Sequence, residues 1–600
     1  MKSFYLLFSH IHFFYILIEV LLNKLKVQSF VYQIHSMQYI KNVLLQLILV
    51  CPFMATAQSS FLPIGDKAYQ LIDRLEIKQQ TNTDLNFSTL KPYNRKYIVE
   101  EVMLLDSIRH LLYDSNKNKL NLTRIDEYNV NQFYMNNKEW KGDFKEADSS
   151  RKPILKSLYQ TRANLVEVNS DHFFLAINPL LQLHAGKASG SDESIYLQSL
   201  GLNARGIIGK RIGFYSSITD NRERGPLFFQ QKVNELNAVP GVGYYKAFNN
   251  TGVNYLDIRG YLTFNAARYV DIQFGYDKNF IGNGYRSLFL SDFGNSYLFA
   301  KLNTRIWKFN YQNLFMELKP QFARGSSIQF EKKYAVMHHL SINLTKWLNV
   351  GLFEAVLFGR KDRFDLMYIN PIIFYRHVES TLGSQDNALA GFDFKANVAH
   401  RLQFYGQFLL DEFKLSQIRA NTGWFANKWG LQLGAKYVDA FGISNLDLQL
   451  ESNRVRPFTY THYSLYSNYA HYNQPLAHPL GANFQEFIGL LKYQPAKKWY
   501  ITGRIIYYTQ GLDSLNGRNF GAAPFLDYNT RQGDYGYKLA GGRKATCLNT
   551  FIQLSYEVRD NLYLDLCAQH RNYKVDNTPN NSTLLTAGIR FNIAKRDYDY

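Results

Sequence analysis

The sequence predicts an all-β transmembrane barrel of about 18 antiparallel strands, preceded by a small N-terminal α-helical segment. Aromatic residues make up 16% of the 600 residues, with 44 Tyr and 44 Phe. The mean hydropathy of -0.29 nevertheless excludes a protein built from many apolar membrane helices. Apolar and polar residues alternate along much of the chain, and short turns alternate with long loops, as in membrane barrels. A large soluble β-sandwich of similar composition is the alternative fold.

The first 57 residues are expected to be a leader that takes no part in the fold. Met37 begins a secretory signal over residues 37–57, which has an early lysine, an apolar core and the small-residue cleavage sequence Ala55-Thr56-Ala57. The apolar run Phe4–Leu22 contains two histidines and a glutamate, which suit a membrane span poorly. We therefore favour a mis-assigned start before Met37, with an inner-membrane anchor as the alternative.

Residues 58–150 are predicted to form a helical segment on the periplasmic side of the barrel. Ile64-Gly65-Asp66 can cap a short helix that runs through Leu75. Apolar residues recur at helical spacing over Tyr97–Leu112, and a more polar stretch follows over Leu122–Trp140. Because these helices are too small to bury much core alone, we expect them to pack against the barrel.

Residues 151–600 are predicted to form the barrel, because apolar and polar residues alternate there with a period of two. Such alternation places one face of a strand in apolar surroundings and the other in water. At roughly 24 residues for each strand and its loop, the stretch holds about 18 strands. The clearest examples are residues 269–277, 402–411, 431–437, 552–558, 562–569 and 585–593, the last being followed by the short tail 595–600.

The predicted connections differ in length at the two ends of the strands. Tight turns are expected at Leu344–Trp347, Ala426–Trp429 and Arg559–Asn561. Long loops are expected over residues 453–486 and 510–546. Short periplasmic turns opposite long outer loops are typical of barrels in the outer membrane of Gram-negative bacteria. We therefore expect outer-membrane lipid and the barrel-assembly machinery among the partners.

The chain is basic, with a formal net charge of +19. A basic surface attracts polyanions. For an outer-membrane protein we expect acidic polysaccharide or lipopolysaccharide phosphate rather than nucleic acid, with a solvated surface that has no specific partner as the alternative. The three cysteines are too few for a disulfide framework. Cys547 and Cys567 lie on neighbouring predicted strands but out of register, so we expect free thiols.

No strong catalytic motif is present, so we expect no enzyme activity, no cofactor and no metal site. His338 and His339 are adjacent, and adjacent residues of a strand point to opposite faces. Asp386, Asp411 and Glu412 are carboxylates of the kind that line barrel lumens for structural reasons or for selectivity.

Several segments resemble a known family. The glycine-rich stretch Phe280–Asp292 resembles a stretch of the Wzi family of capsule-assembly outer-membrane proteins, some of which are labelled gliding-motility protein RemB. Five further residues resemble the central strands of that family: Asn370, Pro371, Glu379, Asp386 and Asn387. The resemblance implies an eighteen-stranded barrel with a periplasmic helical bundle, and a lectin-like role in holding capsular polysaccharide at the cell surface.

Two groups of residues are candidates for ligand binding. Gly282 and Gly284 allow a bend or a close approach of backbone, and Arg286 and Asp292 nearby suit a polar lumen network. This stretch is therefore either an inward-folded loop or a direct ligand contact. The second group is a regularly spaced series in the 453–486 loop, which suits either sugar-stacking platforms or an exposed hairpin: Tyr460, Tyr463, Tyr466 and Tyr469.

The sequence leaves three functions open. The first is a non-enzymatic surface protein that binds or organises capsular polysaccharide or exopolysaccharide. The second is a gliding-motility or surface-organisation component that anchors partner proteins. The third is a diffusion porin, because about 18 strands can enclose an aqueous channel. The oligomeric state and the identity of any glycan are left open as well.

Overall fold

The computed structural model describes residues 59–113, 121–141, 158–190, 193–249, 251–321, 329–360, 363–371, 377–378, 386–514 and 517–600. The chain divides into two compact units, 1–55 and 56–600, and all described residues belong to the second. The expected leader lies outside the described ranges, as does Glu379. No helix in the described ranges is long and apolar enough to cross a membrane.

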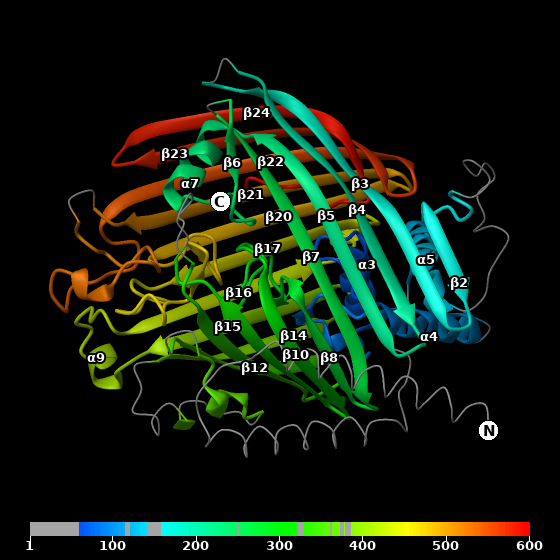
Figure 1. Ribbon diagram of the computed structural model, residues 1–600, viewed down its shortest axis with the longest axis horizontal. Helices are drawn as coiled ribbons and strands as arrows, with labels where there is room; N and C mark the ends of the chain where they lie inside the picture. Colours follow the sequence, from blue (N-terminus) through cyan, green and yellow to red (C-terminus); the bar gives the residue numbers. More distant parts are fainter. Residues whose placement is uncertain are drawn as a thin grey trace, which may run out of the picture. The chain divides into compact units, whose positions relative to one another are not determined.

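Eighteen antiparallel strands close into a barrel, which confirms the predicted fold class and excludes the sandwich (Figure 1). Strand β24 returns to pair with β3, from Leu584 opposite Ala188 to Phe591 opposite Leu181. The barrel strands are β3 (Phe173–Ala188), β4 (Ile195–Ile208), β5 (Ile212–Arg224), β7 (Gly252–Ala267), β8 (Val270–Asp277), β10 (Tyr297–Ile306), β11 (Phe309–Leu318), β12 (Lys333–Asn343), β13 (Leu348–Phe358), β14 (Asn387–Val398), β15 (Leu402–Glu412), β16 (Lys428–Tyr437), β17 (Leu446–Val455), β20 (Phe484–Ala496), β21 (Trp499–Leu512), β22 (Arg543–Arg559), β23 (Leu562–Val575) and β24 (Thr578–Phe591).

The short strands lie beside the barrel wall or inside it. Strand β2 (Val166–Ser170) pairs with the beginning of β3, and β6 (Lys246–Phe248) pairs with β7. Two further pairs form small separate sheets: β1 (Leu90–Lys91) with β9 (Phe280–Ile281), and β18 (Ala470–His471) with β19 (Gln474–Pro475).

The barrel wall is apolar outside and polar inside. On β15, Phe404 and Phe408 are 43% and 38% exposed, whereas Gln403 and Gln407 are 1% and 3% exposed. This arrangement is the reverse of a soluble protein, because the exposed face is the one that meets lipid. The alternation in the sequence therefore has the physical cause expected for a membrane barrel.

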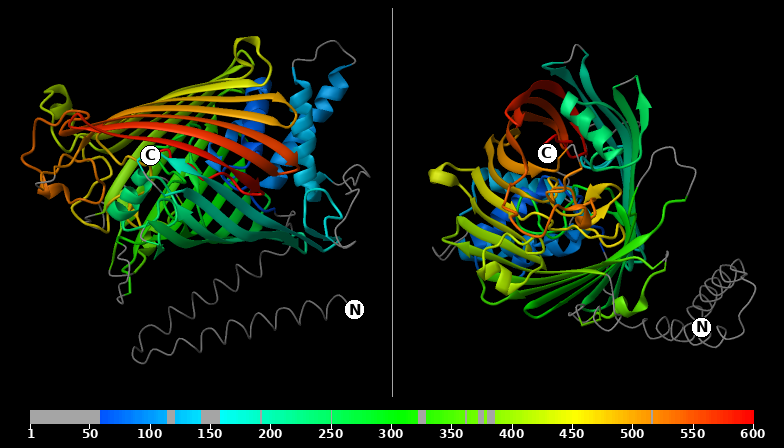
Figure 2. Two further views of the ribbon diagram at one scale, coloured as in Figure 1. Left: turned by 90° about the horizontal axis from the view of Figure 1, so that it is seen from above. Right: turned by 90° about the vertical axis from the view of Figure 1, so that its left-hand side faces the viewer.

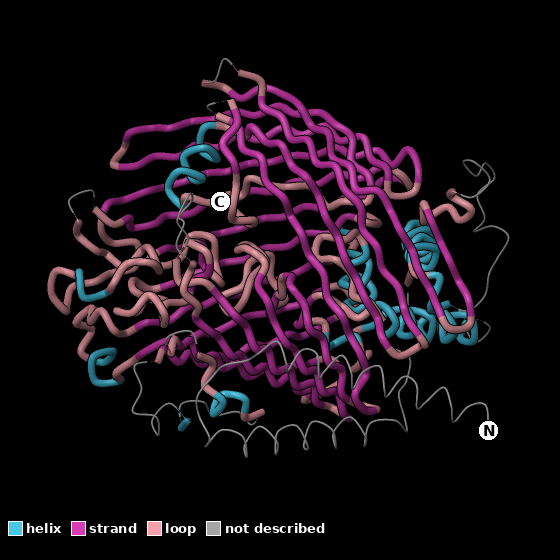
Figure 3. Tube along the Cα trace, in the orientation of Figure 1, coloured by secondary structure: helices cyan, strands magenta, loops and turns pink. Residues whose placement is uncertain are grey.

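The two ends of the barrel differ as predicted (Figure 3). At the turn end, Leu344–Trp347 joins β12 to β13 and Asp560-Asn561 joins β22 to β23, which confirms two tight turns. At the loop end, residues 456–483 and 513–542 connect β17 to β20 and β21 to β22, as predicted. The hairpin between β23 and β24 is a tight exception at the loop end.

The tight turn expected at Ala426–Trp429 is wrong. Lys428 and Trp429 begin β16, and residues 413–427 form a connection at the loop end that contains α9 (Leu415–Arg419). Asn427 suggested a hairpin turn, but its side-chain Oδ1 accepts a hydrogen bond from the Lys414 backbone N–H at 3.0 Å. The asparagine therefore closes the base of a longer loop.

The N-terminal helices lie at the turn end (Figure 2). They are α3 (Ala68–Gln79), α4 (Arg95–Tyr113), α5 (Arg124–Asn136) and α6 (Lys138–Lys141), with the short η1 (Leu85–Phe87) after α3. Asp66 accepts a hydrogen bond from the Ala68 backbone N–H at 2.8 Å, as the predicted capping sequence suggests. Thr123 and Asp126 form a capping box at the start of α5. The predicted boundaries of 58–150 and 151–600 stay predictions.

Helix α3 is tied to the inner wall of the barrel by ion pairs. Arg74 contacts Asp126 of α5, and also Asp439 in the turn between β16 and β17 and Asp447 near the start of β17. The Lys78 ammonium lies 2.7 Å from Asp126 and 2.8 Å from Asp439. We call these five residues the Arg74 hub. The hub joins two helices to the wall, so the helical segment is part of the barrel's interior structure.

Cys547 and Cys567 are buried and free, as predicted. Cys567 lies opposite Gln553, and Cys547 lies opposite Tyr573, so the two thiols are far out of register on β22 and β23.

Candidate functional site

The glycine-rich stretch forms a loop that folds into the lumen. Residues 278–296 connect β8 to β10, and within them β9 pairs with β1. Leu288, Phe289 and Leu290 are fully buried there. The Phe289 ring stacks on Phe353 of the wall, with centroids 4.3 Å apart. We call residues 278–296 the inward loop, and its burial agrees with the inward-folded alternative predicted from the sequence.

Gly284 lies where the inward loop passes close to the wall. A Cβ atom on Gly284 would lie 2.4 Å from Oε2 of Glu451 on β17. That carboxylate accepts hydrogen bonds from the backbone N–H groups of Tyr285 at 2.7 Å and Arg286 at 3.1 Å. A Cβ on Gly282 would similarly lie 3.0 Å from Nε2 of Gln407. Both glycines therefore serve a close approach of backbone to wall, as the sequence suggested.

Arg286 belongs to a polar network inside the lumen. Its guanidinium lies 2.9 Å from Asp599 and 3.8 Å from Glu486. Asp292 lies elsewhere on the inward loop, where its carbonyl oxygen accepts a hydrogen bond from Lys278 Nζ at 3.0 Å. Of the two predicted lumen residues, only Arg286 is therefore placed in this network among the residues that the structure describes.

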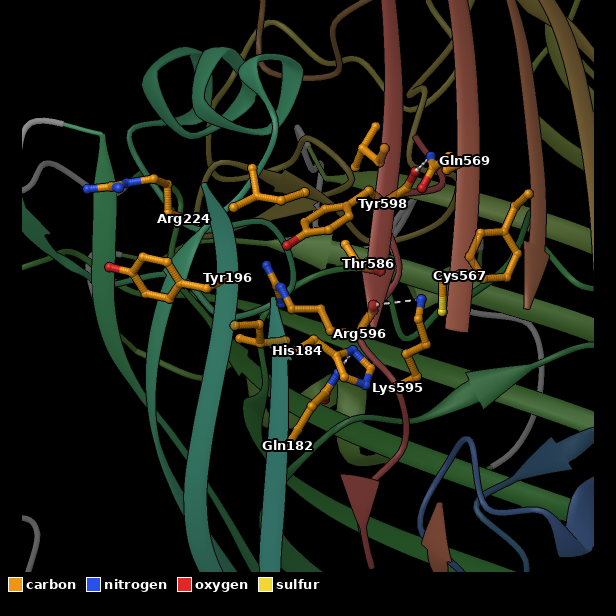
Figure 4. A pocket seen from close by; sticks show the side chains of 14 residues that line it. Gln182, His184, Tyr196, Arg224, Cys567, Gln569, Thr586, Lys595, Arg596 and Tyr598 are labelled. Atoms are coloured by element: carbon orange, nitrogen blue, oxygen red, sulfur yellow. Dashed lines mark hydrogen bonds between the residues drawn. The ribbon is translucent and has the colours of Figure 1, made fainter. Parts of the chain in front are cut away.

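Asp599 belongs to residues 595–600, which turn back from β24 into the lumen and which we call the returning segment. Asp597 pairs with Arg504 at 2.9 Å, and Arg596 pairs with Glu223 at 2.9 Å. Tyr598 lies between β3 and β23, and Gln569 Nε2 donates a hydrogen bond to its carbonyl oxygen at 2.6 Å (Figure 4). The tail that the sequence places after the last strand is therefore part of the lumen filling.

The carboxyls of the returning segment are held in their charged form. Burial alone would raise the pKa of Asp597, but the adjacent Lys595 ammonium and Arg504 guanidinium outweigh it and lower that pKa. Asp599 behaves in the same way: burial raises its pKa, and Arg286 and Arg504 lower it below the usual range. Both carboxylates therefore stay ionised at neutral pH, which keeps the ion pairs intact.

Tyr460 and Tyr469 pack inside the barrel, so neither predicted role fits them. Each is 1% exposed, and their rings lie 5.4 Å apart. The hydroxyl of Tyr460 donates to the Leu288 carbonyl at 2.8 Å, and that of Tyr469 donates to the Phe289 carbonyl at 2.7 Å. The loop over residues 456–483 folds inward rather than forming an exposed hairpin. These two tyrosines therefore hold the inward loop and present no ring face to a sugar.

Tyr463 and Tyr466 are half-buried at the loop end. The hydroxyl of Tyr466 donates a hydrogen bond to Glu331. Tyr463 packs with His462, at 4.3 Å between ring centroids, and with Tyr528, at 5.9 Å. The ring centroids of His462 and Tyr528 lie 5.8 Å apart, and both side chains are half-buried. We call His462, Tyr463 and Tyr528 the loop-end aromatic cluster.

A charged pair lies beside this cluster. Arg360 donates two hydrogen bonds to Asp386, at 2.7 and 2.6 Å, and the Tyr368 hydroxyl donates a third at 2.7 Å. A Cβ atom on Gly359, the neighbour of Arg360, would lie 2.7 Å from the Tyr466 side chain, so the pair lies against the loop that carries the cluster. Burial and then the negative charge of Asp386 raise the pKa of Tyr463. Burial and the Lys428 ammonium lower the pKa of His462 to about 4, so its ring is neutral at pH 7.

Three further residues of the resemblance are among those that the structure describes. Asn387 is buried at the start of β14, directly after Asp386. Asn370 and Pro371 are exposed after the short helix η3 (Leu366–Ile369), and the Pro371 carbonyl accepts a hydrogen bond from Tyr311. Sequence reasoning missed Arg360, His462 and Tyr528. Of these, only His462 had a local signal, because it precedes Tyr463 directly.

The residues considered for metal binding or catalysis make structural contacts. His339 Nε2 lies 2.7 Å from Asp393, whereas His338 lies 3.9 Å from Glu354. Asp411 accepts a hydrogen bond from the Tyr460 backbone N–H at 2.7 Å, and Glu412 lies 3.2 Å from Lys428. Among the residues that the structure describes, no group of three or more His, Cys, Asp or Glu side chains is arranged to hold a metal ion.

Comparison with known proteins places the chain in a family. The family model described as "Capsule assembly protein Wzi" matches residues 215–583. The solved structure of Wzi from Escherichia coli, described as a carbohydrate-binding β-barrel involved in group 1 capsule assembly, shares 13% identity over 90% of this chain and 100% of that one, with a TM-score of 0.53.

Two further solved structures are similar with lower scores. OprD of Pseudomonas aeruginosa has 10% identity over 70% of this chain and 94% of its own, with a TM-score of 0.40. OccAB2 of Acinetobacter baumannii has 10% identity over 70% of this chain and 98% of its own, with a TM-score of 0.39. A comparison with curated proteins finds no match. The family model covers more than half of the chain, and the chain folds into an eighteen-stranded barrel. The chain therefore belongs to the Wzi family of capsule-assembly proteins and is an outer-membrane β-barrel.

Proposed function

We propose that this protein binds or organises capsular polysaccharide or exopolysaccharide at the cell surface, without catalysis, through the loop-end aromatic cluster. The observation that supports this proposal is the arrangement of His462, Tyr463 and Tyr528, three half-exposed rings in mutual contact beside the Asp386–Arg360 pair. Ring faces pack against the C–H face of a sugar, and neighbouring polar groups fix its hydroxyls. The net charge of +19 favours an acidic polymer.

We also propose that the loop end faces the exterior and the helical segment faces the periplasm. Support comes from the connections, because short turns lie on the periplasmic side of outer-membrane barrels and long loops lie outside. The described helices α3–α6 all belong to the turn end. In this orientation the loop-end aromatic cluster is available to a surface polymer. The barrel-assembly machinery would insert the strands, and the oligomeric state stays open.

The porin alternative has less support. The inward loop, the returning segment and helix α3 all place side chains inside the barrel. We therefore expect planar bilayers that contain the purified protein to show no steady single-channel conductance. Steady conductance at neutral pH would favour the porin over the surface-binding function.

The anchor alternative, including a role in gliding motility, is favoured by one feature. Helix η3 presents Leu366, Met367 and Ile369 to the outside, at 70%, 50% and 48% exposure. An apolar surface of this kind suits lipid or a partner protein. Stable partners that co-purify from the outer membrane, together with no affinity for glycan, would favour an anchor.

Binding of polysaccharide is expected to depend on the cluster. Replacing both Tyr463 and Tyr528 by Ala should weaken binding of an acidic surface polysaccharide by about tenfold, or about 1.4 kcal/mol, because two stacking faces are lost. Full-length protein in detergent would be titrated with acidic and with neutral surface polysaccharides over a salt series. The expected result is saturable binding that survives moderate salt.

Tyr269→Ala is the matched control, because Tyr269 is 44% exposed at the turn end. This variant should bind like the native protein. Equal affinity of the double variant and the native protein, or binding that disappears with modest salt, would show that the positive charge attracts polyanions without a site.

A further inference from the structure

A chamber lies at the turn end of the barrel, between the helical segment and the wall formed by β8, β10 and β11. Its volume is about 120 Å³. A buried water molecule needs roughly 10–15 Å³ of cavity volume, so the chamber has room for about ten water molecules. A hexose has about as many heavy atoms, so a single sugar residue fits.

The helical side of the chamber is aromatic. Phe61, Phe87 and Tyr97 line it, and the first two are buried at 9% and 7% exposure. The Arg305 guanidinium lies over the rings of Tyr97 and Phe87, at 3.9 and 4.5 Å from their centroids. Arg305 also donates a hydrogen bond to Asp84 at 2.9 Å. Because Arg305, Tyr97 and Asp84 are only half-buried, they form a rim through which a small molecule can enter.

The opposite side is a wall of amide side chains. Gln273 of β8, Asn303 of β10, and Asn310 and Gln312 of β11 line the chamber. The strand register places Asn303 directly opposite Gln312, and Arg305 opposite Asn310. Lys301 lies beside them, opposite Gln273, with its ammonium 4.8 Å from the Phe61 ring. Amides both donate and accept hydrogen bonds, as sugar hydroxyls do.

Two of these amides have buried polar atoms without hydrogen-bond partners in the described part of the chain. Gln273 is 2% exposed, and neither its Nε2 nor its Oε1 is hydrogen-bonded there. Asn310 is 4% exposed, and its Oδ1 has no partner there either. Leaving a buried polar group unpaired destabilises a fold. A cavity that is lined by such groups on one side and by rings on the other is built for a polar ligand with an apolar face.

We propose that this chamber is a second saccharide site, which takes a single hexose or hexuronate residue between Phe61 and Phe87 on one side and Gln273, Asn303 and Asn310 on the other. The choice of a sugar as ligand rests on the proposed function. Two cations, Lys301 and Arg305, and two carboxylates, Asp84 and Asp271, line the chamber, so its charge selects neither a hexose nor a hexuronate. The chamber is separate from the loop-end aromatic cluster, so each site can be tested without the other.

The test uses the full chain in detergent micelles with glucose and glucuronate as probes, followed by saturation-transfer NMR. The native protein should give a saturable signal for at least one of the two probes. Gln273→Leu should weaken this binding at least tenfold. Its midpoint of urea unfolding should be unchanged or higher, because the variant removes an unpaired amide. Asn303→Trp, at a half-buried position of the amide wall, should block binding by filling the chamber.

The Tyr463→Ala, Tyr528→Ala double variant separates the two proposals, because its polysaccharide binding at the loop end should weaken about tenfold while the monosaccharide signal is retained. Absence of a saturable signal for both probes would overturn the chamber as a sugar site. Full affinity in Gln273→Leu and Asn303→Trp would overturn it as well. A lower unfolding midpoint for Gln273→Leu would show that the amide is already satisfied by water alone, which also contradicts the proposal.

Discussion

Replacing Arg74 by Met is expected to release the helical segment from the barrel. The Arg74 side chain is 4% exposed and contacts Asp126, Asp439 and Asp447. Removing it leaves three carboxylates clustered with Lys78 as the remaining cation of the hub. Breaking a buried ion pair by removing one partner costs about 3–5 kcal/mol. Because the hub connects α3 and α5 to the wall, this loss of free energy should weaken the packing of the helices against the wall.

Limited proteolysis in detergent measures the effect. The helical segment of Arg74→Met should be cut at least a hundredfold faster than that of the native protein, while the strands stay resistant, because cleavage follows the population of the open form. Lys232→Met is the control, since its partner Glu235 is 66% exposed and an exposed pair contributes little. Equal protection of the helices in both variants would contradict the role of the hub.

The same docking should weaken in acid. Burial alone raises the pKa of Asp126, but hydrogen bonds and charge from Arg74, with Lys78, outweigh it and lower that pKa from 3.8 to about 2. A carboxyl with a depressed pKa stabilises the folded state above its unfolded pKa, and the contribution is lost as pH falls through the folded value. About 2 kcal/mol should therefore be present at pH 5 and disappear between about pH 4 and pH 2. Proteolysis with an acid-stable protease at pH 5, 3.5 and 2 measures this loss.

Neutralising both carboxyls of the returning segment is expected to expel it from the lumen. The double variant Asp597→Asn, Asp599→Asn leaves Arg504 and Arg286 buried at 5% and 6% exposure without these carboxylates. Uncompensated buried charge costs about 3 kcal/mol or more, so the released form should become over a hundredfold more populated. Trypsin should then cleave after Lys595 or Arg596, two sites that are shielded in the native protein by their contacts with Asp597 and Glu223.

Intact-mass spectrometry after brief digestion reports this release. The native protein should keep residues 597–600, and the double variant should lose them. Asp576→Asn is the matched control, because Asp576 pairs with Arg543 at the surface and is 51% exposed. Equal retention of the segment in native protein and double variant would show that Tyr598 and Tyr600 hold it by packing alone. Their contacts with Phe228 and Phe229 on α7 (Leu227–Leu236) are the basis of that alternative.

The strands were predictable because the two faces of a membrane barrel meet different solvents. The alternation in residues 402–411 and 562–569 depends only on local sequence, and β15 and β23 follow it. The direction in which loops fold has no such local signal. Nothing in the local sequence distinguishes Tyr460 and Tyr469 from surface tyrosines. The carbonyl oxygens that accept hydrogen bonds from their hydroxyls belong to the inward loop, 172 and 180 residues away.

The candidate site was predicted only in part for the same reason. Tyr463 was visible within one loop, but Tyr528 comes from another loop, and only the closed barrel brings the two rings together. The chamber behind the helices had no signal in the sequence. Gln273 and Asn310 occupy ordinary inward positions on β8 and β11, and what distinguishes them is the missing partner.

The seam between β3 and β24 has a consequence for how the barrel closes. Only eight residue pairs join these strands, although they are about 400 positions apart in the sequence, and loop-closure entropy must be overcome to bring them together. The beginning of β3 is paired already with β2 through five residue pairs of a local hairpin. These five pairs can form early and cover part of the edge that could attract another chain, and the other eight pairs form when β24 arrives.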